Sequence, residues 1–274
     1  MVEGYILNVG CGNMTAIKFE NGKKMIIDCN ITEDSADNII EFLEEKGFDE
    51  IDVFINTHRD SDHLRGIKIL DENIPIYEIW DNGFPGSTDA NEYKDYMALR
   101  REKTNRILKA KTIDDGKFCE DIVLRYLNSN NGETNEINDT SLVIKIDYLG
   151  SSILFAGDAS FKPWKEKVIP YYSESKLKSN ILVASHHGSI TFFDDPADDK
   201  NYYTEHIKKI NPVLTIISVG DNQWDLPDEK AIEIYENYSS GTINGTKVLR
   251  TDEDGNIYFK LKGYGSWEWK KGVR

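Results

Sequence analysis

Short hydrophobic runs separated by polar turns open the chain, and each run is long enough for one β-strand. The runs lie at residues 5–9, 15–19 and 24–28. Asn21 and Gly22 predict a tight hairpin turn between the second and third runs, because both residue types tolerate positive φ. Apolar residues then recur every three or four positions, which predicts a helix over 35–46 that ends at Gly47. A further apolar run at 51–55 predicts a buried strand.

Strand and helix patterns alternate in the second half of the chain. Strands are predicted at 141–148, 152–156, 180–184 and 213–218. Helices are predicted at 161–171, at 204–210 and from about residue 227. The last two strand patterns, 247–249 and 256–261, flank the polar residues 252–255, and together they predict a final hairpin. His206 lies in a predicted helix outside any motif, so we interpret it as a surface residue.

The middle of the chain, from about residue 71 to 120, has a weaker pattern. A loop is predicted at 83–87 and a helix around 93–111, and residues 83–120 could form a lid or an insertion. The basic run at 100–111 has two interpretations, a solvated helix face or a ridge that binds a nucleic-acid strand.

The order of these elements predicts an α/β fold. Strands dominate the start and the centre, helices separate the later strands, and each candidate ligand described below follows a strand. This arrangement predicts a four-layer αββα sandwich. Neither a low-complexity linker nor a repeat of fixed period divides the sequence, so we expect residues 1–274 to form a single domain.

Composition narrows the class of protein. Of the 274 residues, 39% are hydrophobic, which is enough for a core. The sequence lacks both an apolar stretch of about 18 residues and an amino-terminal signal pattern, so we expect a soluble, cytoplasmic protein without a membrane partner. Cys11, Cys29 and Cys119 are widely spaced and are expected to be reduced and structural. The net charge of -15 argues against a protein that coats nucleic acid, although bound divalent ions would still allow phosphate to bind locally.

Four of the five histidines fall in two short motifs at the ends of predicted strands. The motifs are Thr57-His58-Arg59-Asp60-Ser61-Asp62-His63 and Ser185-His186-His187-Gly188-Ser189, with Gly157-Asp158 between them. Imidazoles and carboxylates bind metals, and the first motif places several of them within reach of one cation. The expected ligands are His58, Asp60, Asp62, His63, Asp158, which can bridge, and His187 or His186. Two ions about 4 Å apart would activate a bridging hydroxide, which is hydrolase chemistry.

The motifs resemble those of the metallo-β-lactamase fold hydrolases, and they are most similar to the ComEC-like branch. That branch characteristically shows Ser/Thr-His-x-Asp-x-Asp-His, an Asn-x-x-Ser before a Gly-Asp strand end, and Ser-His-His-Gly-Ser. The matching segments are 57–63, 138–141, 155–158 and 185–189, and the opening segments 7–13 and 26–29 are also similar. The resemblance covers nearly the whole chain. It implies a binuclear hydrolase with two divalent ions, Zn²⁺ or Mn²⁺, free-standing and without the membrane channel of ComEC.

The resemblance also implies nuclease or phosphodiesterase activity, with nucleic acid or a small nucleotide as the substrate. Asp62 and His186 would be catalytic. Asn138 and Ser189 would contact substrate, although a turn at Asn138 and a cap at Ser189 are equally consistent with the sequence. Asp60 stands where the wider superfamily has a histidine, which favours harder ions such as Mn²⁺ without excluding Zn²⁺.

Two other functions stay open at this point. The metals could serve cleavage of a carboxylic ester, lactone or thioester, against which the Ser-His-His-Gly-Ser motif argues. The chain could also be a catalytically weak metal-binding interaction domain. Leu226 favours this second alternative, because relatives often carry a histidine just before the following proline. The survival of Asp62, His63 and Asp158 argues against it.

Overall fold

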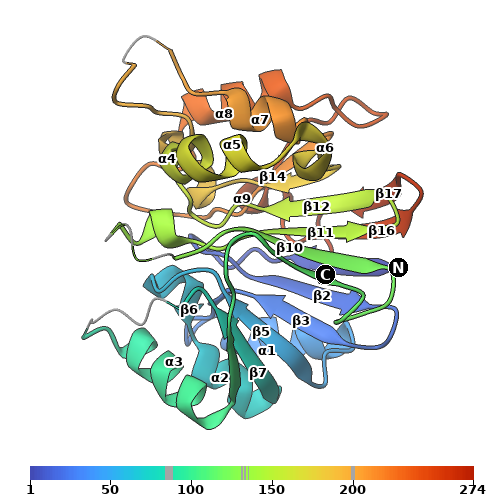
Figure 1. The fold of residues 1–274 in the computed structure, drawn as a ribbon. Coiled ribbons are helices and arrows are strands. Elements are labelled where there is room, and N and C mark those ends of the chain that lie inside the picture. Colours follow the sequence, from blue (N-terminus) through green and yellow to red (C-terminus); the bar gives the residue numbers. More distant parts are fainter. Residues whose placement is uncertain (84–88, 131, 133, 135, 199–200) are drawn as a thin grey trace.

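The computed structural model describes residues 1–83, 89–130, 132, 134, 136–198 and 201–274. Two sheets pack face to face, and helices cover both outer faces, as Figure 1 shows. The first sheet is covered by α1 (Ala36–Glu45), α2 (Ile67–Asn73) and α3 (Asn91–Glu102). The second is covered by α4 (Phe161–Pro163), α5 (Ile169–Tyr171), α6 (Glu174–Leu177), α7 (Glu205–Ile210) and α8 (Glu229–Tyr238). The predicted four-layer αββα sandwich is therefore confirmed.

The first sheet has the strand order β17-β16-β1-β2-β3-β5-β7-β8. Its strands are β1 (Val2–Ile6), β2 (Thr15–Phe19), β3 (Lys24–Ile27), β5 (Ile51–Asn56), β7 (Ile76–Asp81), β8 (Thr104–Ile107), β16 (Ile257–Gly263) and β17 (Ser266–Lys270). Pairing is antiparallel from β17 to β3 and parallel from β3 to β8. Gly22, at φ 86°, lies in the predicted turn between β2 and β3.

The second sheet has the order β15-β14-β13-β12-β11-β10-β9. Its strands are β9 (Thr112–Asp115), β10 (Ile122–Asn128), β11 (Val143–Tyr148), β12 (Ser151–Phe155), β13 (Ile181–Val183), β14 (Leu214–Ile217) and β15 (Val248–Arg250). Pairing is antiparallel from β9 to β12 and parallel from β12 to β15. Parallel strands end at the same edge of a sheet, so the loops that follow them are neighbours. A short pair, β4 (Cys29–Asn30) with β6 (Leu64–Arg65), lies apart from the two sheets.

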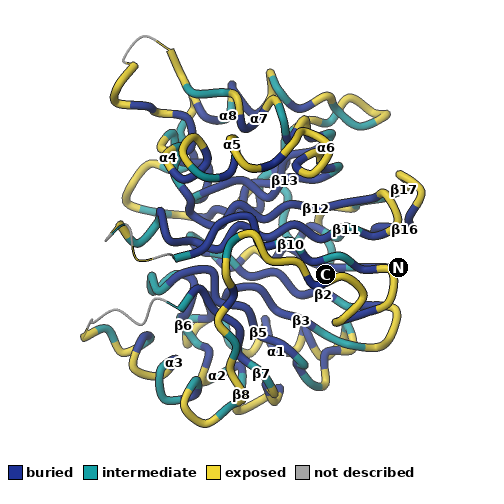
Figure 2. Tube along the Cα trace, in the orientation of Figure 1, coloured by how far each residue is buried: buried dark blue, intermediate teal, exposed yellow. Residues whose placement is uncertain are grey.

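The main core lies between the two sheets, where apolar side chains from both inner faces meet. Figure 2 shows most of the strands as buried, whereas exposed residues concentrate on the helices and turns. A separate cluster fills the space between the second sheet and its helices. Trp164 and Tyr235 are completely buried in that cluster.

Two strand predictions are wrong. The first strand lies at Val2–Ile6 rather than 5–9. Leu7 and Val9 extend the apolar pattern because they are buried in the loop that follows the strand. The final hairpin does not form: β15 pairs with β14 and β16 pairs with β1, in different sheets. The predicted turn at 252–255 instead overlaps α9 (Thr251–Asp254), which joins the two sheets. Apolar alternation defines a strand but does not select its partner.

The helix predicted over 93–111 is wrong in its second half. The helix α3 ends at Glu102, and β8 begins at Thr104. The basic run is therefore not one helix face. Arg100 forms an ion pair with Asp81, and Nη1 of Arg106 lies 2.6 Å from Oδ2 of Asp114. Both arginines thus make contacts within the protein.

His206 is not a surface residue. Its exposed fraction is 0%, and Nε2 donates a hydrogen bond of 2.8 Å to the carbonyl of Phe192. The helix α7 turns this side chain toward the second sheet, where aromatic rings surround it. Sequence position alone does not distinguish the two faces of so short a helix.

The predicted loop at 83–87 falls largely on 84–88, which lie outside the described residues. The described remainder of 83–120 contains α3, β8 and β9. A lid function for this segment and a single domain for the whole chain stay predictions. In the described part of the chain, every helix is too short or too polar to cross a membrane.

Candidate metal centre

The candidate ligands lie on loops that follow parallel strands of the two sheets. His58 comes two residues after β5, and the short turn η1 (Ser61–His63) follows it. Asp158 comes three residues after β12, and His187 comes four residues after β13. The first sheet and the second sheet thus each supply part of the candidate site.

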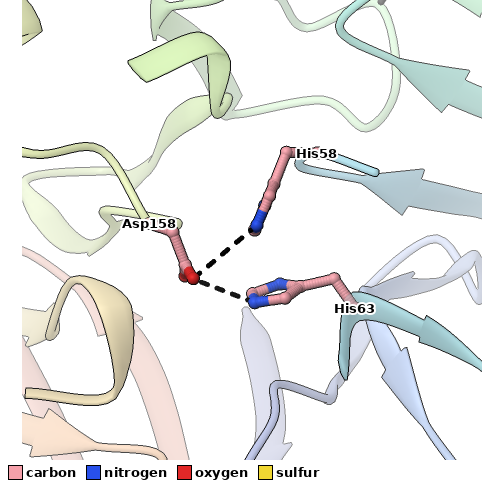
Figure 3. Close-up of side chains that lie close together, drawn as sticks. All are labelled: His58, His63 and Asp158. Atoms are coloured by element: carbon pink, nitrogen blue, oxygen red, sulfur yellow. Dashed lines mark ion pairs between the residues drawn. The ribbon is translucent and has the colours of Figure 1, made fainter. Parts of the chain in front are cut away.

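One group of ligand atoms contains His58, His63 and Asp158, whose side chains point toward one another in Figure 3. Nε2 of His58 lies 3.6 Å from Oδ2 of Asp158, and Nε2 of His63 lies 3.3 Å from Oδ1 of the same carboxylate. The exposed fractions are 0% for both histidines and 2% for Asp158. These three side chains form a buried set able to hold one cation.

A second group contains Asp62, His63 and His187. Oδ2 of Asp62 lies 3.0 Å from Nε2 of His187 and 3.8 Å from Nε2 of His63. His187 is also 3.8 Å from Asp158, measured from Nε2 to Oδ2. The two groups meet at His63, whose one free ring nitrogen can bind an ion in only one of the two adjacent positions.

Hydrogen bonds from the outer ring nitrogens orient the histidines. Nδ1 of His63 donates to Oδ2 of Asp28 over 2.7 Å, and Nδ1 of His187 donates to the carbonyl of Ser218 over 2.9 Å. Nδ1 of His58 is 3.1 Å from Oγ1 of Thr57, which itself donates to Asp28. Metal-binding histidines characteristically make such outer hydrogen bonds, which direct the unprotonated nitrogen to the cation.

The residues fit a metal ion by a second test. Nε2 of His58, Nε2 of His63 and Oδ1 of Asp158 are buried, and apart from their approach to one another they have no hydrogen-bond partner among the described residues. Buried polar atoms without a partner are costly and rare in folded proteins. Nitrogen and carboxylate oxygen donors suit divalent ions such as Zn²⁺ and Mn²⁺.

The charged side chains of the cluster shift one another's pKa values. Burial disfavours the charged form of His63, but Asp158, Asp28 and Asp62 outweigh burial and raise the pKa of His63 well above its usual value. Burial likewise opposes ionisation of Asp158, yet the surrounding histidines hold its pKa well below the usual range. Without a metal, the carboxylates therefore retain a proton on His63. A divalent cation would bind in its place, since metal binding displaces ligand protons.

Asp60 and His186 lie at the edge of the cluster. Oδ2 of Asp60 is 3.6 Å from Nε2 of His58, and its side chain is 39% exposed. Nε2 of His186 is 3.9 Å from Oδ2 of Asp158. Burial lowers the pKa of His186 despite the nearby carboxylate, which keeps the imidazole neutral at pH 7.

The two predicted substrate contacts lie on either side of His186. Nδ2 of Asn138 is 3.5 Å from Nε2 of His186, and Oδ1 of Asn138 is buried without a hydrogen-bond partner among the described residues. Oγ of Ser189 accepts hydrogen bonds from the backbone N–H and hydroxyl of Thr191. Ser189 thus caps the following turn, and its contact with substrate stays a prediction.

The backbone of the second motif is strained. His186, His187 and Gly188 have φ values of 49°, 53° and 82°. A Cβ on Gly188 would lie 2.6 Å from Cβ of Pro227, so glycine is required both by conformation and by space. Two consecutive left-handed histidines are costly, and such strain is concentrated at functional sites.

Two cavities meet at the cluster. The first, of about 560 Å³, is lined by Cys11, Asp60, Ser61, Asp62, Asp158, His186, His187, Ser189, Trp224, Leu226 and Asp228. The second, of about 530 Å³, is lined by Asp60, Glu136, Ile137, Asn138, Asp139, Ser160, Phe161, Lys162, His186 and Thr191. Asp60 and His186 belong to both cavities, so a cleft extends on both sides of them. The described lining of each cavity contains no residue of the basic run at 100–111.

No role was predicted from the sequence for two residues that support the candidate ligands, although both lie in segments that resemble the family. Asp28 contacts both His63 and Thr57, and it has φ 58°, which aspartate tolerates better than most residues. Ser141 accepts the backbone N–H of Asp158 through its hydroxyl. A polar residue directly after a buried strand was the available signal for Asp28.

The chain matches no protein-family model. It is 27% identical over 228 residues to ComE operon protein 3 of Bacillus subtilis, across 82% of this chain and 26% of that protein. It is 24% identical over 245 residues to Recombination protein 2 of Haemophilus influenzae, across 87% of this chain and 27% of that protein. The chain therefore spans about a quarter of the length of these curated relatives.

Several solved structures share its fold. Igni18, a metallo hydrolase from Ignicoccus hospitalis, aligns with a TM-score of 0.54 and 12% identity, over 95% of this chain and 100% of that chain. CmlA, a diiron β-hydroxylase from Streptomyces venezuelae, aligns with a TM-score of 0.56 and 13% identity, over 95% of this chain and 54% of that chain. A diphosphatase from the PhnP family aligns with a TM-score of 0.50 and 15% identity, over 95% of this chain and 98% of that chain. The chain therefore has the metallo-β-lactamase fold, and the curated proteins that it resembles over most of its length are members of the ComEC-like family.

Proposed function

We propose that this protein is a metal-dependent phosphodiesterase that acts on nucleic acid or a small nucleotide. The observation that carries this proposal is the cluster of candidate ligand atoms from His58, His63, Asp158, Asp62 and His187, which borders an open cavity. Two divalent ions about 4 Å apart form the usual arrangement for displacement at phosphorus. Their charge would also offset the acidic residues around the cavity, so that an anionic substrate can approach.

The ions would be held by His58, Asp60, Asp62, His63, Asp158 and His187, and this set of three carboxylates and three imidazoles suits Mn²⁺ or Zn²⁺. When bound, they would supply an activated water and withdraw charge from the phosphate. Asp62 would orient that water by accepting its hydrogen bond. Burial opposes the charged form of Asp62, but His63 and the hydrogen bond from His187 keep its pKa below the usual value.

His186 would orient the departing oxygen. It lies in the wall shared by the two cavities, and its Nδ1 is 3.2 Å from Oγ1 of Thr191, which donates to Ser189. Asn138 stands on the other side of the ring and would contact the substrate or hold the imidazole.

Names of similar proteins agree with a phosphate ester as the substrate. One sequence relative is a recombination protein, and one structural neighbour is a diphosphatase. Leu226 lies in the wall of the first cavity and supplies no proton donor there. We therefore propose that His186 alone serves the leaving group.

The test is hydrolysis of bis(p-nitrophenyl) phosphate and labelled single-stranded DNA by metal-stripped protein that is given Mn²⁺, Zn²⁺ or Mg²⁺. We expect metal-dependent turnover with at least one ion, and its loss in Asp62→Ala. A parallel assay with p-nitrophenyl acetate separates phosphodiesters from carboxylic esters. Cleavage of the acetate alone, or no turnover despite bound ions, would contradict the proposal.

A further inference from the structure

Trp224 is a large aromatic residue on the surface of the first cavity. Its exposed fraction is 63%, and it lines the cavity together with Asp62, Asp158 and His187. Indole rings usually bury most of their area. An exposed ring at the entrance to a candidate active site is therefore available to a ligand.

The loop that carries Trp224 is held in place by Asn222. Oδ1 of Asn222 accepts the backbone N–H groups of Trp224 and Leu226, each over 3.0 Å. Nδ2 of Asn222 donates to the carbonyls of Gly220 and Leu226, each over 2.8 Å. One side chain thus satisfies four backbone groups, which reduces the cost of ordering the backbone that carries the indole.

The charge of the first cavity limits what Trp224 can bind. The described lining contains four carboxylates, those of Asp60, Asp62, Asp158 and Asp228, and no lysine or arginine. Bound ions would offset the charge of Asp60, Asp62 and Asp158, which leaves Asp228 and no cationic side chain in the described lining to hold a phosphate away from the ions, so an uncharged part of the substrate fits this side. Trp224 and Leu226 supply the apolar surface on this side.

We propose that Trp224 stacks on an unpaired nucleobase attached to the scissile phosphodiester, an inference that rests on the proposed function. Aromatic side chains stack on any base because every base has a π-face. A base within a duplex has both faces covered by its neighbours. Trp224 therefore selects unpaired bases without selecting their sequence.

The second cavity gives the rest of the substrate a place. It lies beyond Asp60 and His186, and its lining includes Lys162 and Phe161 together with the carboxylates of Glu136 and Asp139. A strand whose base stacks on Trp224 can continue past the candidate metal positions into this cavity. This geometry favours an oligonucleotide over a mononucleotide.

Binding to the metal-loaded protein tests the inference without requiring turnover. The probes are a fluorescent single-stranded oligonucleotide with phosphorothioate linkages, the same strand with abasic positions, and a dinucleotide. The variants are Trp224→Ala, Trp224→Phe and the matched control Tyr264→Ala. Tyr264 is also an exposed aromatic residue, at 89%, and lies in the turn between β16 and β17.

We expect Trp224→Ala to weaken binding of the base-bearing strand about tenfold, and Trp224→Phe and Tyr264→Ala to change it less than about twofold. The abasic strand should lose much less, and the dinucleotide should bind more weakly than the longer strand. An equal loss on the abasic strand, or no loss at all, would overturn the inference. A base-dependent loss in a protein that cleaves no phosphodiester would support stacking of a base on Trp224 and reject the proposed function. Cleavage combined with base-independent binding would do the reverse.

Discussion

His63 and His206 are both completely buried, yet folding shifts their pKa values in opposite directions. Carboxylates of Asp158, Asp28 and Asp62 surround His63, and they raise its pKa although burial acts against them. Around His206 lie aromatic rings, the nearest being that of Phe192 at 4.1 Å between centroids, and burial lowers its pKa to about 3. Burial alone therefore does not identify a histidine of a candidate functional site. The carboxylates beside His63 distinguish it from His206.

The two regions also differ in what their unpaired atoms face. Nε2 of His63 faces the ligand atoms of other residues, whereas Nδ1 of His206 faces apolar packing, and neither is hydrogen-bonded within the described chain. A cation can satisfy the first atom. The second region has only a packing role, with Nε2 bonded to the carbonyl of Phe192.

The strongest way to break the comparison is to remove the shared carboxylate with Asp158→Asn. The variant keeps the size of the side chain but loses a charged ligand that contacts four histidines. We expect metal affinity to fall by more than about 100-fold, because changing an outer partner of a ligand already costs 10–100-fold. Competition with a fluorescent chelator measures the dissociation constant. His206→Leu is the control and should keep the affinity of the natural protein. Equal affinities in Asp158→Asn and the natural chain would reject the ligand assignment.

A subtler change is Asp28→Asn, which leaves every proposed ligand in place. The amide still accepts the hydrogen bond from His63 but no longer carries charge. We expect metal affinity to fall about 10-fold or somewhat more, within the range for outer partners of metal-binding histidines. The same chelator competition applies. Asp49→Asn is a matched control, since Asp49 is an exposed carboxylate that pairs with Lys24 far from the histidines. A fall of the same size in the control would show that the effect is not specific to His63.

The smallest expected effect concerns His206 and the pH dependence of the free energy of unfolding. Because folding lowers the pKa of His206, the unfolded chain takes up a proton below about pH 6.5 that the folded chain does not. The free energy of unfolding should therefore decrease as the pH falls below 6.5. His206→Leu removes this proton, so its loss of stability between pH 7 and 5.5 should be smaller by about 1 kcal/mol. Urea titrations at both pH values, with a chelator present, measure the difference. Parallel pH dependences in the two proteins would contradict the buried, neutral state of His206.

Local patterns in the sequence were sufficient for much of the fold. The hairpin turn at Gly22, the helix α1 and the strand β5 depend on neighbouring residues, and all three form as predicted. The clustering of His58, His63 and Asp158 was also predictable, because the ligands sit on loops after strands. What these features share is that short segments determine them.

Features that depend on distant contacts were not predictable. The strands β15 and β16 have ordinary alternation, and only their partners β14 and β1 place them in different sheets. The segment after α3 becomes a strand because it pairs with β7 at the edge of the first sheet and because Arg106 forms an ion pair with Asp114. Asp28 gains its role only when folding brings His63, 35 residues later, within 2.7 Å.

The candidate ligands come from both halves of the sandwich: His58 and His63 follow a strand of the first sheet, and Asp158 and His187 follow strands of the second. An ion held by both sets would cross-link the two sheets at this edge. Removing the ion would break this link between the loops of the two sheets. Stripping the metal should therefore loosen the contact between the two sheets at this edge.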